Sequence, residues 1–222
     1  MKAAVVVFSC ISANSLLKFD LDERSRIMKQ SMSLRRWDNF YEMFMSKYDF
    51  PDLLEVYSYG CYCLSMGDRP LSGTGANQPP VDARDVQCKA WTTCYKCARI
   101  DVNNKCQPET VNYSWFKDEN DQIVCDPGNN PCKAAICECD KYFVDNFRNL
   151  DHVFNENFSE FHGFKRQESC YTNRDGTGGS NGGGNSNTVT LECCGDAGKR
   201  EFFNSETKMC CADGSIKPLG LC

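Results

Sequence analysis

Seventeen cysteines constrain this chain more than any other feature of its sequence. Cytosolic chains of 222 residues rarely carry so many, whereas secreted domains use cysteines as disulfide cross-links in an oxidising compartment. The alternative is zinc or iron–sulfur ligation. Cys94 and Cys97 form a C-x-x-C motif, but no second pair follows at zinc-finger spacing. The adjacent pairs Cys193–Cys194 and Cys210–Cys211 also favour bridges, so the sequence predicts a disulfide-rich protein.

The N-terminus is typical of a secreted protein. Met1 is followed, after one lysine, by the apolar run AAVVVFSCISA, which has the length of a signal peptide and is too short to span a bilayer. Small residues place the expected cleavage after Ser15, which makes 1–15 the predicted signal peptide. Its removal takes Cys10 away and leaves sixteen cysteines, an even number that can pair completely. No transmembrane segment is expected, and the predicted localisation is extracellular.

The remaining chain is expected to contain a leader, a main domain and a small module. Residues 16–36 are charged and lack periodicity, which is typical of a leader or propeptide; Arg35-Arg36 is either a processing site or an ordinary surface pair. Residues 64–80 are rich in glycine, proline and serine and predict a long loop, and the glycine-rich residues 176–187 predict a flexible one. Two N-x-S sequons, at Asn112 and Asn157, predict a glycoprotein if both asparagines lie on the surface.

The cysteines fall into two blocks. Residues 61–139 hold ten of them and residues 170–222 hold six. Both numbers are even, so each block can close its own bridges, which favours two modules. The predicted boundaries are 37–155 for the main domain, 156–169 for a linker and 170–222 for a cysteine-rich module.

The main domain shows the patterns of three helices and one hairpin. An aromatic stripe predicts a first helix that ends at Pro51; its members are Trp37, Phe40, Tyr41, Phe44 and Tyr48. A second helix is expected to begin near Asp82 and to run past Tyr95, and a third to run from about Cys132 to Leu150. Alternating residues between Cys106 and Cys125 predict the hairpin.

Four fragments of this domain, in order, resemble the secreted phospholipase A2 family over roughly residues 37–150. They are YGCYC at 59–63, PVD at 80–82 leading into Asp85, CKAWTTCY at 88–95 and CECD at 137–140. The resemblance implies a mainly α, disulfide-rich fold, in which a pair of long antiparallel helices, 82–100 and 132–150, is joined by an N-terminal helix and a small β-hairpin. A small cysteine-rich module would follow this phospholipase A2-like domain.

The resemblance also implies a set of disulfides: Cys63–Cys88, Cys94–Cys139, Cys106–Cys132 and Cys125–Cys137. Cys61 and Cys97 remain, and they can pair with each other by default; the pairing of the C-terminal cysteines stays open. The family usually has one further bridge, but its two positions hold Gln87 and Asn146 here. Both ends of one cross-link are therefore missing together.

The catalytic motif departs from the family pattern. Members of the family hydrolyse the sn-2 ester of phospholipids with a histidine base, an aspartate that orients it, and calcium, and their motif reads C-x-x-H-D-x-C-Y. Here Trp91 stands at the base position and Thr92 at the position of the calcium carboxylate. An indole offers only an N–H donor, and a neutral hydroxyl is a poor substitute for an anionic ligand.

The expected calcium loop is degenerate as well, because Leu64 and Met66 occupy glycine positions after Tyr62. Two members of the site survive, Tyr95 and Asp140, and a structural role is expected for both, in which Asp140 accepts hydrogen bonds from Tyr95 or from the Trp91 indole. The histidines, His152 and His162, lack suitable neighbours in the sequence. No catalytic residue is expected to be intact, no cofactor is expected, and calcium binding should be weak or lost.

The resulting function hypothesis is a secreted, non-catalytic phospholipase A2-like protein that binds a phospholipid surface, an extracellular protein or a mineral matrix, as otoconin-type matrix proteins do. One alternative is a calcium-dependent phospholipase A2 with altered residues, using a water held by Asp140. Another is a toxin-like ligand that acts on a membrane or receptor without catalysis. The net charge of -5 argues against a general nucleic-acid binder. Residues 193–222 loosely resemble double-cysteine repeats of galaxin-type matrix proteins, which favours binding or assembly.

Overall fold

The computed structural model describes residues 38–64, 76, 78–103, 105–148, 154–171, 190–196 and 199–222. The predicted signal peptide and leader, Trp37, Met66, His152 and the glycine-rich loop lie outside these residues. In the described part, no helix is both long enough and apolar enough to cross a membrane.

Two long helices form the centre of the fold, α4 (Ala83–Asp101) and α5 (Pro131–Asn146). The side chain of Asp82 caps α4 and that of Asn130 caps α5, each by accepting a backbone N–H of the first turn. Proline follows at the first turn of α5, where its missing N–H costs nothing. Both helices start within one residue of their predicted starts, whereas α5 ends at Asn146, before the predicted Leu150.

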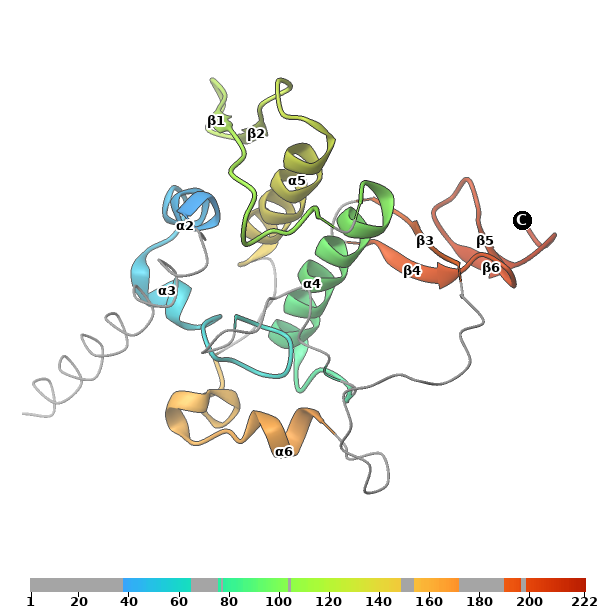
Figure 1. Ribbon diagram of the computed structural model, residues 1–222. Coiled ribbons are helices and arrows are strands. Elements are labelled where there is room, and N and C mark those ends of the chain that lie inside the picture. The colour runs from blue at the N-terminus through green and yellow to red at the C-terminus, as the bar shows by residue number, and fades with distance from the viewer. Residues whose placement is uncertain are drawn as a thin grey trace, which may run out of the picture.

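The two helices run in opposite directions, side by side (Figure 1). Arg84 at the start of α4 donates to the carbonyl of Phe147, just past the end of α5. Further along α4, Cys94 is bonded to Cys139, which lies earlier on α5. Later residues of α4 therefore lie beside earlier residues of α5, as the predicted antiparallel pair requires.

The predicted first helix is divided into α2 (Asp38–Met45) and α3 (Phe50–Leu54). Phe40 and Phe44 of α2 are buried against Phe143 of α5 and Phe147 just past its end, so these two members of the aromatic stripe are core. The prediction that Pro51 ends a helix is wrong. Proline lacks only an N–H that the first turn of a helix leaves unbonded, and Pro51 stands in the first turn of α3, which Asp49 caps.

The predicted hairpin is formed by β1 (Trp115–Lys117) and β2 (Ile123–Cys125), which pair antiparallel with Trp115 opposite Cys125. Residues 154–171, most of which were predicted to be a linker, form short elements that pack on the main domain. These are η2 (Glu156–Phe158), η3 (Glu160–His162) and α6 (Arg166–Cys170), with α6 below the long helices in Figure 1. Tyr59 bridges to Ser159, and Cys61 is bonded to Cys170.

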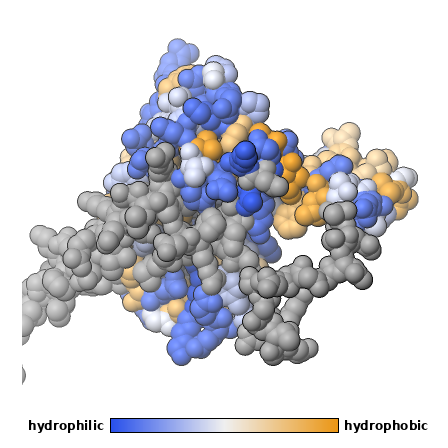
Figure 2. Space-filling view, viewed as in Figure 1, coloured by the Kyte–Doolittle hydropathy of each residue, from blue (hydrophilic) through white to orange (hydrophobic). Residues whose placement is uncertain are grey.

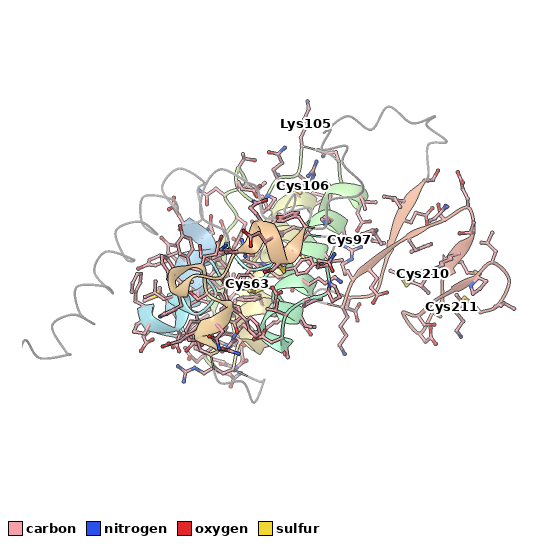
Figure 3. The ribbon with its side chains drawn as sticks, turned by 90° about the horizontal axis from the view of Figure 1, so that it is seen from below. Cys63, Cys97, Lys105, Cys106, Cys210 and Cys211 are labelled. Atoms are coloured by element: carbon pink, nitrogen blue, oxygen red, sulfur yellow. A yellow bond between two sulfur atoms is a disulfide. The ribbon has the colours of Figure 1, made fainter. Side chains whose placement is uncertain are left out.

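The C-terminal part is a pair of two-stranded antiparallel sheets, built from β3 (Leu191–Cys194) with β4 (Glu201–Asn204) and from β5 (Lys208–Cys210) with β6 (Ile216–Pro218). A disulfide between Cys97 and Cys193 joins β3 to α4. Figure 3 shows Cys97 on the side of α4 that is turned toward these strands. The bridges within this part are Cys194–Cys210 and Cys211–Cys222.

The disulfides confirm one prediction and correct another. All four bridges implied by the family resemblance are present. The expectation that each cysteine block closes its own bridges is wrong, since Cys61 and Cys97 do not pair with each other and each is bonded to a cysteine beyond residue 169. Even numbers permit closed blocks but do not require them. The predicted domain boundaries themselves stay a prediction.

Candidate functional site

The predicted catalytic positions meet between the two long helices. Trp91 and Tyr95 lie one turn apart on α4, which places both side chains on the face toward α5. Asp140 lies opposite them on α5, next to the Cys94–Cys139 bridge that holds the helices together. The residues that the sequence analysis selected on two distant segments are therefore neighbours.

Asp140 is the centre of a buried hydrogen-bond network. Its carboxylate accepts hydrogen bonds from Trp91 Nε1 at 2.8 Å, from the Tyr113 hydroxyl at 2.7 Å and from the Tyr95 hydroxyl. The hydrogen bonds from Tyr95 and Trp91 are those that the sequence analysis expected, whereas the role of Asp140 stays a prediction. The sequence analysis did not single out Tyr113 for the site, because its alternation with Trp115 indicated only a strand. Three donors satisfy a carboxyl group that is almost completely hidden from water.

Burial sets the protonation of this network. It raises the pKa of Asp140 to about 6, although the hydrogen bonds from Tyr95, Tyr113 and Trp91 act in the opposite direction. Burial, followed by the nearby Asp140 charge, raises the pKa of both Tyr95 and Tyr113 well above the ordinary tyrosine value. The two phenols therefore stay protonated at neutral pH and act as donors.

The raised pKa of Asp140 predicts a pH-dependent stability. The ordinary aspartate value is 3.8, so the folded protein keeps this proton up to a higher pH than the unfolded chain does. The stability that Asp140 contributes is thus fully present below about pH 4 and is lost as the pH rises through about 6. An Asp140→Asn variant lacks this titration, so the unfolding free energy of the wild type minus that of the variant should fall between pH 4 and 7 and then level off.

Urea unfolding at a series of pH values checks this expectation. The matched control is Glu119→Gln, which removes an exposed carboxylate from the hairpin turn and so reports any pH dependence that does not come from Asp140. A wild type and an Asp140→Asn variant that stay separated by a constant free energy from pH 4 to 7 would refute the raised pKa.

The Trp91 indole fills the position of the expected catalytic base. Its ring stacks on Phe143 with centroids 4.3 Å apart and packs on Phe40 at 4.4 Å, and the residue is 1% exposed. Its single polar group, Nε1–H, already donates a hydrogen bond to Asp140. An indole nitrogen in this state accepts no proton from water. The arrangement is that of a packed core with one satisfied polar group.

Thr92, at the position of the expected calcium carboxylate, is turned to its own helix. Its hydroxyl donates to the carbonyl of Lys89 at 2.9 Å, a bond that many helical threonines make. Thr92 is buried, and it brings no negative charge. A hard dication prefers anionic oxygen ligands, which this position does not supply.

The described start of the segment around Tyr62 and Leu64 offers a calcium ion few ligands. The carbonyl of Leu64 accepts the N–H of Ser58 at 2.5 Å and so is already engaged. The ammonium group of Lys89 lies 5.2 Å from the centre of the Tyr62 ring, where its positive charge opposes a second cation. Met66 lies outside the described residues. The described members of the predicted calcium set, Tyr62, Leu64 and Thr92, do not fit a calcium ion.

Side chains of α4 and α6 hold residues 59–63, the segment that precedes the predicted calcium loop. Asp85 of α4 accepts the N–H groups of Cys61 and Tyr62, at 2.9 and 2.7 Å. From the other side, Arg166 of α6 donates to the carbonyls of Tyr59, Gly60 and Cys63, at 2.8, 2.7 and 3.1 Å. The sequence analysis missed Arg166 because it lies in the predicted linker, and no local pattern marks its partner. A guanidinium group bonded to three carbonyls holds residues 59–63 in place.

Another arginine spans the place of the missing cross-link. Gln87 and Asn146 occupy the two positions where the family usually has cysteines. Arg84, one turn before Gln87, donates to the Phe147 carbonyl at 2.6 Å, and its guanidinium carbon lies 4.0 Å from the centre of the Phe147 ring. The start of α4 and the end of α5 are therefore joined by a hydrogen bond and a cation–π contact.

Of the two histidines, the structure describes only His162. His162 ends η3, where its ring lies near Phe154 and 3.9 Å from a Glu156 carboxylate oxygen. His152 lies outside the described residues. Across the part of the chain that the structure describes, no group of three or more histidine, cysteine, aspartate or glutamate side chains could hold a metal ion.

Comparison with known proteins decides the family. The sequence model of the phospholipase A2 family matches residues 37–159, more than half of the chain. The chain belongs to the phospholipase A2 family. It is 35% identical over 107 residues to a phospholipase A2 homolog of Echis carinatus sochureki, an alignment that covers 48% of this chain and 75% of the relative.

Other phospholipase A2 relatives are similar at the same level. The basic phospholipase A2 homolog ecarpholin S of Echis carinatus is 35% identical over 107 residues, which are 48% of this chain and 75% of that protein. The acidic phospholipase A2 beta of Crotalus adamanteus is 38% identical over 106 residues, 46% of this chain and 65% of the relative. The strands β3–β6 lie beyond the residues that the family model matches.

Proposed function

We propose that this chain is a secreted, non-catalytic member of the phospholipase A2 family that acts by binding, as an extracellular binding or matrix protein. The observation that carries the proposal is the state of Trp91. At the position where the family has its base, a buried indole stacks on Phe143, packs on Phe40 and donates its N–H to Asp140. General-base catalysis needs an acceptor within reach of the attacking water, and the indole is none.

The donor set of the loop supports the same proposal. Calcium in the family polarises the ester carbonyl and stabilises the oxyanion. Here Thr92 is neutral, Leu64 uses its carbonyl within the protein, and Lys89 adds a positive charge nearby. Loss of the base and loss of the metal ligands each suffice to stop hydrolysis. A substitution that restored only one of them would therefore not restore activity.

An extracellular location is supported by the disulfides and by the relatives. Eight bridges are formed by the sixteen cysteines beyond the predicted signal peptide. Such a density belongs to an oxidising compartment. Asn112 and Asn157 are both exposed, so glycosylation at the two sequons is part of the proposal. The candidate partners are an extracellular protein, a phospholipid surface and a mineral matrix.

A lipid hydrolysis assay tests the proposal. With mixed phospholipid–detergent micelles and calcium, we expect the wild-type chain to release no fatty acid above background, while an active phospholipase A2 serves as the positive control. The Trp91→His/Thr92→Asp variant returns the base and the carboxylate to α4. If the double variant releases fatty acid and the wild type does not, residues 91 and 92 account for the loss of hydrolysis. Calcium-dependent release by the wild type would overturn the proposal.

A further inference from the structure

A groove lies between the outer face of α4 and the C-terminal strands, away from the Asp140 network. One part of it, of about 650 Å³, is bounded by α4 and by residues 199–202 at the start of β4. A second part, of about 470 Å³, continues toward Tyr62 and the Pro79–Pro80 segment. The two parts share Lys89, Thr93 and Phe202, so they form one elongated groove that is open to solvent.

Positive charge is concentrated along this groove, although the chain as a whole is acidic. The cations are Lys89 and Lys96 on α4 and Lys199 and Arg200 on the opposite wall, against one carboxylate, Glu201. Arg200 is paired with Asp101. Within the described ranges, no carboxylate lies within ion-pair distance of the other three, the lysines.

The two lysines of α4 rest on aromatic rings in place of acidic partners. Lys89 Nζ lies 5.2 Å from the Tyr62 ring centre, and Lys96 Nζ lies 5.9 Å from the Phe202 ring centre. Burial, and then the charge of Lys89, lower the pKa of Lys96. An anion placed between the two ammonium groups would relieve this repulsion.

The groove also presents apolar side chains that are partly open to solvent. Val86 and Phe202 are 53% and 45% exposed, and Ala90 lies between Lys89 and Thr93 on the same face of α4. Figure 2 shows apolar residues gathered over the C-terminal strands, on the right of the view. Exposed apolar side chains beside lysines that lack a carboxylate partner among the described residues are typical of a binding surface. Its partner would carry both acidic and apolar groups.

We propose that this groove binds an extended acidic peptide segment of a partner protein, with carboxylates on Lys89 and Lys96 and apolar side chains on Val86 and Phe202. This proposal names a partner for the proposed binding function, and it rests on that function. A flat bilayer would reach the exposed Val86 and Phe202 but not the half-buried Lys96. A sulfated glycan would match the cations but would leave the apolar side chains without a partner.

Fluorescence anisotropy with the full-length, disulfide-intact chain tests this assignment. The probe is a short labelled synthetic peptide in which glutamate and leucine alternate; one comparison peptide carries glutamine for glutamate, and another carries serine for leucine. We expect the first peptide to bind, each comparison peptide to bind about tenfold more weakly, and added salt to weaken the binding by screening. No binding of the first peptide, or equal binding of the glutamine peptide, would overturn the proposal.

Charge-reversal variants locate the site. The Lys89→Glu/Lys96→Glu variant should bind the first peptide at least about tenfold more weakly, because like charges then face each other. Its matched control, Lys105→Glu/Lys208→Glu, carries the same charge change on exposed residues, of which Lys105 projects from the body in Figure 3, and should bind within about twofold of wild type. Because Lys96 is half-buried, Lys89→Glu alone is included, and thermal melts confirm that each variant is folded.

The apolar contribution has its own pair of variants. Phe202→Ser should weaken binding, whereas Phe116→Ser, which changes a 48% exposed phenylalanine on β1, should not. Peptide binding that is insensitive to both the lysine and the Phe202 variants would overturn the proposal. So would stronger binding of heparin or of anionic vesicles at the same lysines, or a concentration-dependent dimer that buries them. Fatty-acid release in the micelle assay does not depend on peptide binding, so the non-catalytic proposal and the peptide-groove proposal can be refuted independently.

Discussion

Replacement of Trp91 by alanine is expected to lower the free energy of unfolding by about 3–5 kcal/mol, the range for removing a fully buried tryptophan. The indole is stacked on Phe143 and packed on Phe40, and both rings are buried. Alanine would leave a cavity between them. It would also remove one of the three donors of Asp140, and a buried carboxyl group that loses a partner costs further free energy.

Guanidinium unfolding with the disulfides intact, followed by circular dichroism, measures this loss. Trp115→Ala is the matched control, because Trp115 is only half-buried on β1, and its cost should be about half or less. Trp91→Phe keeps most of the packing and removes the donor, so it separates the two contributions. Equal losses for Trp91→Ala and Trp115→Ala would contradict the description of Trp91 as the core of a filled site.

Removal of the Cys61–Cys170 bridge should have an effect of similar size. We expect the Cys61→Ala/Cys170→Ala variant to lose about 2–5 kcal/mol, because the bridge closes a long stretch of chain. Its cysteines are 109 positions apart and completely buried. The bridge also holds α6 in place, so that Arg166 stays on the carbonyls of Tyr59 and Gly60.

The same unfolding experiment, together with trypsin digestion, checks this prediction. Without the bridge, the buried Arg166 should become accessible and cleavage after it should accelerate. The control is Cys211→Ala/Cys222→Ala, whose cysteines are 11 positions apart near the exposed C-terminal end, and its cost should be smaller. If neither stability nor cleavage at Arg166 changed in the first variant, α6 would be held by noncovalent contacts alone.

Much of the central fold could be predicted from the sequence, because its determinants are local or carried by the family pattern. Periodicity and the family resemblance placed the starts of α4 and α5, and the positions of the cysteines within the resemblance placed four bridges. The meeting of Trp91 and Tyr95 with Asp140 followed from the same resemblance. Helix ends were less predictable, as Pro51 shows, because proline both ends and begins helices.

The remaining features depend on tertiary placement that no local pattern encodes. Arg166 binds carbonyls more than a hundred positions away, and backbone carbonyls carry no sequence signature. Tyr113 reaches Asp140 from an irregular segment before β1. Cys61 and Cys97 were left without partners in the family pattern because their partners lie beyond it, in α6 and in β3.

The adjacent cysteines of β3 have a geometric consequence. Successive residues of a strand point to opposite faces, and here Cys193 is bonded to α4 while Cys194 is bonded to Cys210 of β5. One peptide unit thus stands between two covalent attachments, so the second sheet is tethered to the helix by the shortest linkage that a polypeptide allows. If a single residue were inserted between Cys193 and Cys194, both side chains would point to the same face of the strand. One of the two disulfides could then no longer form without a change in the backbone, so this dipeptide does not tolerate a change in length.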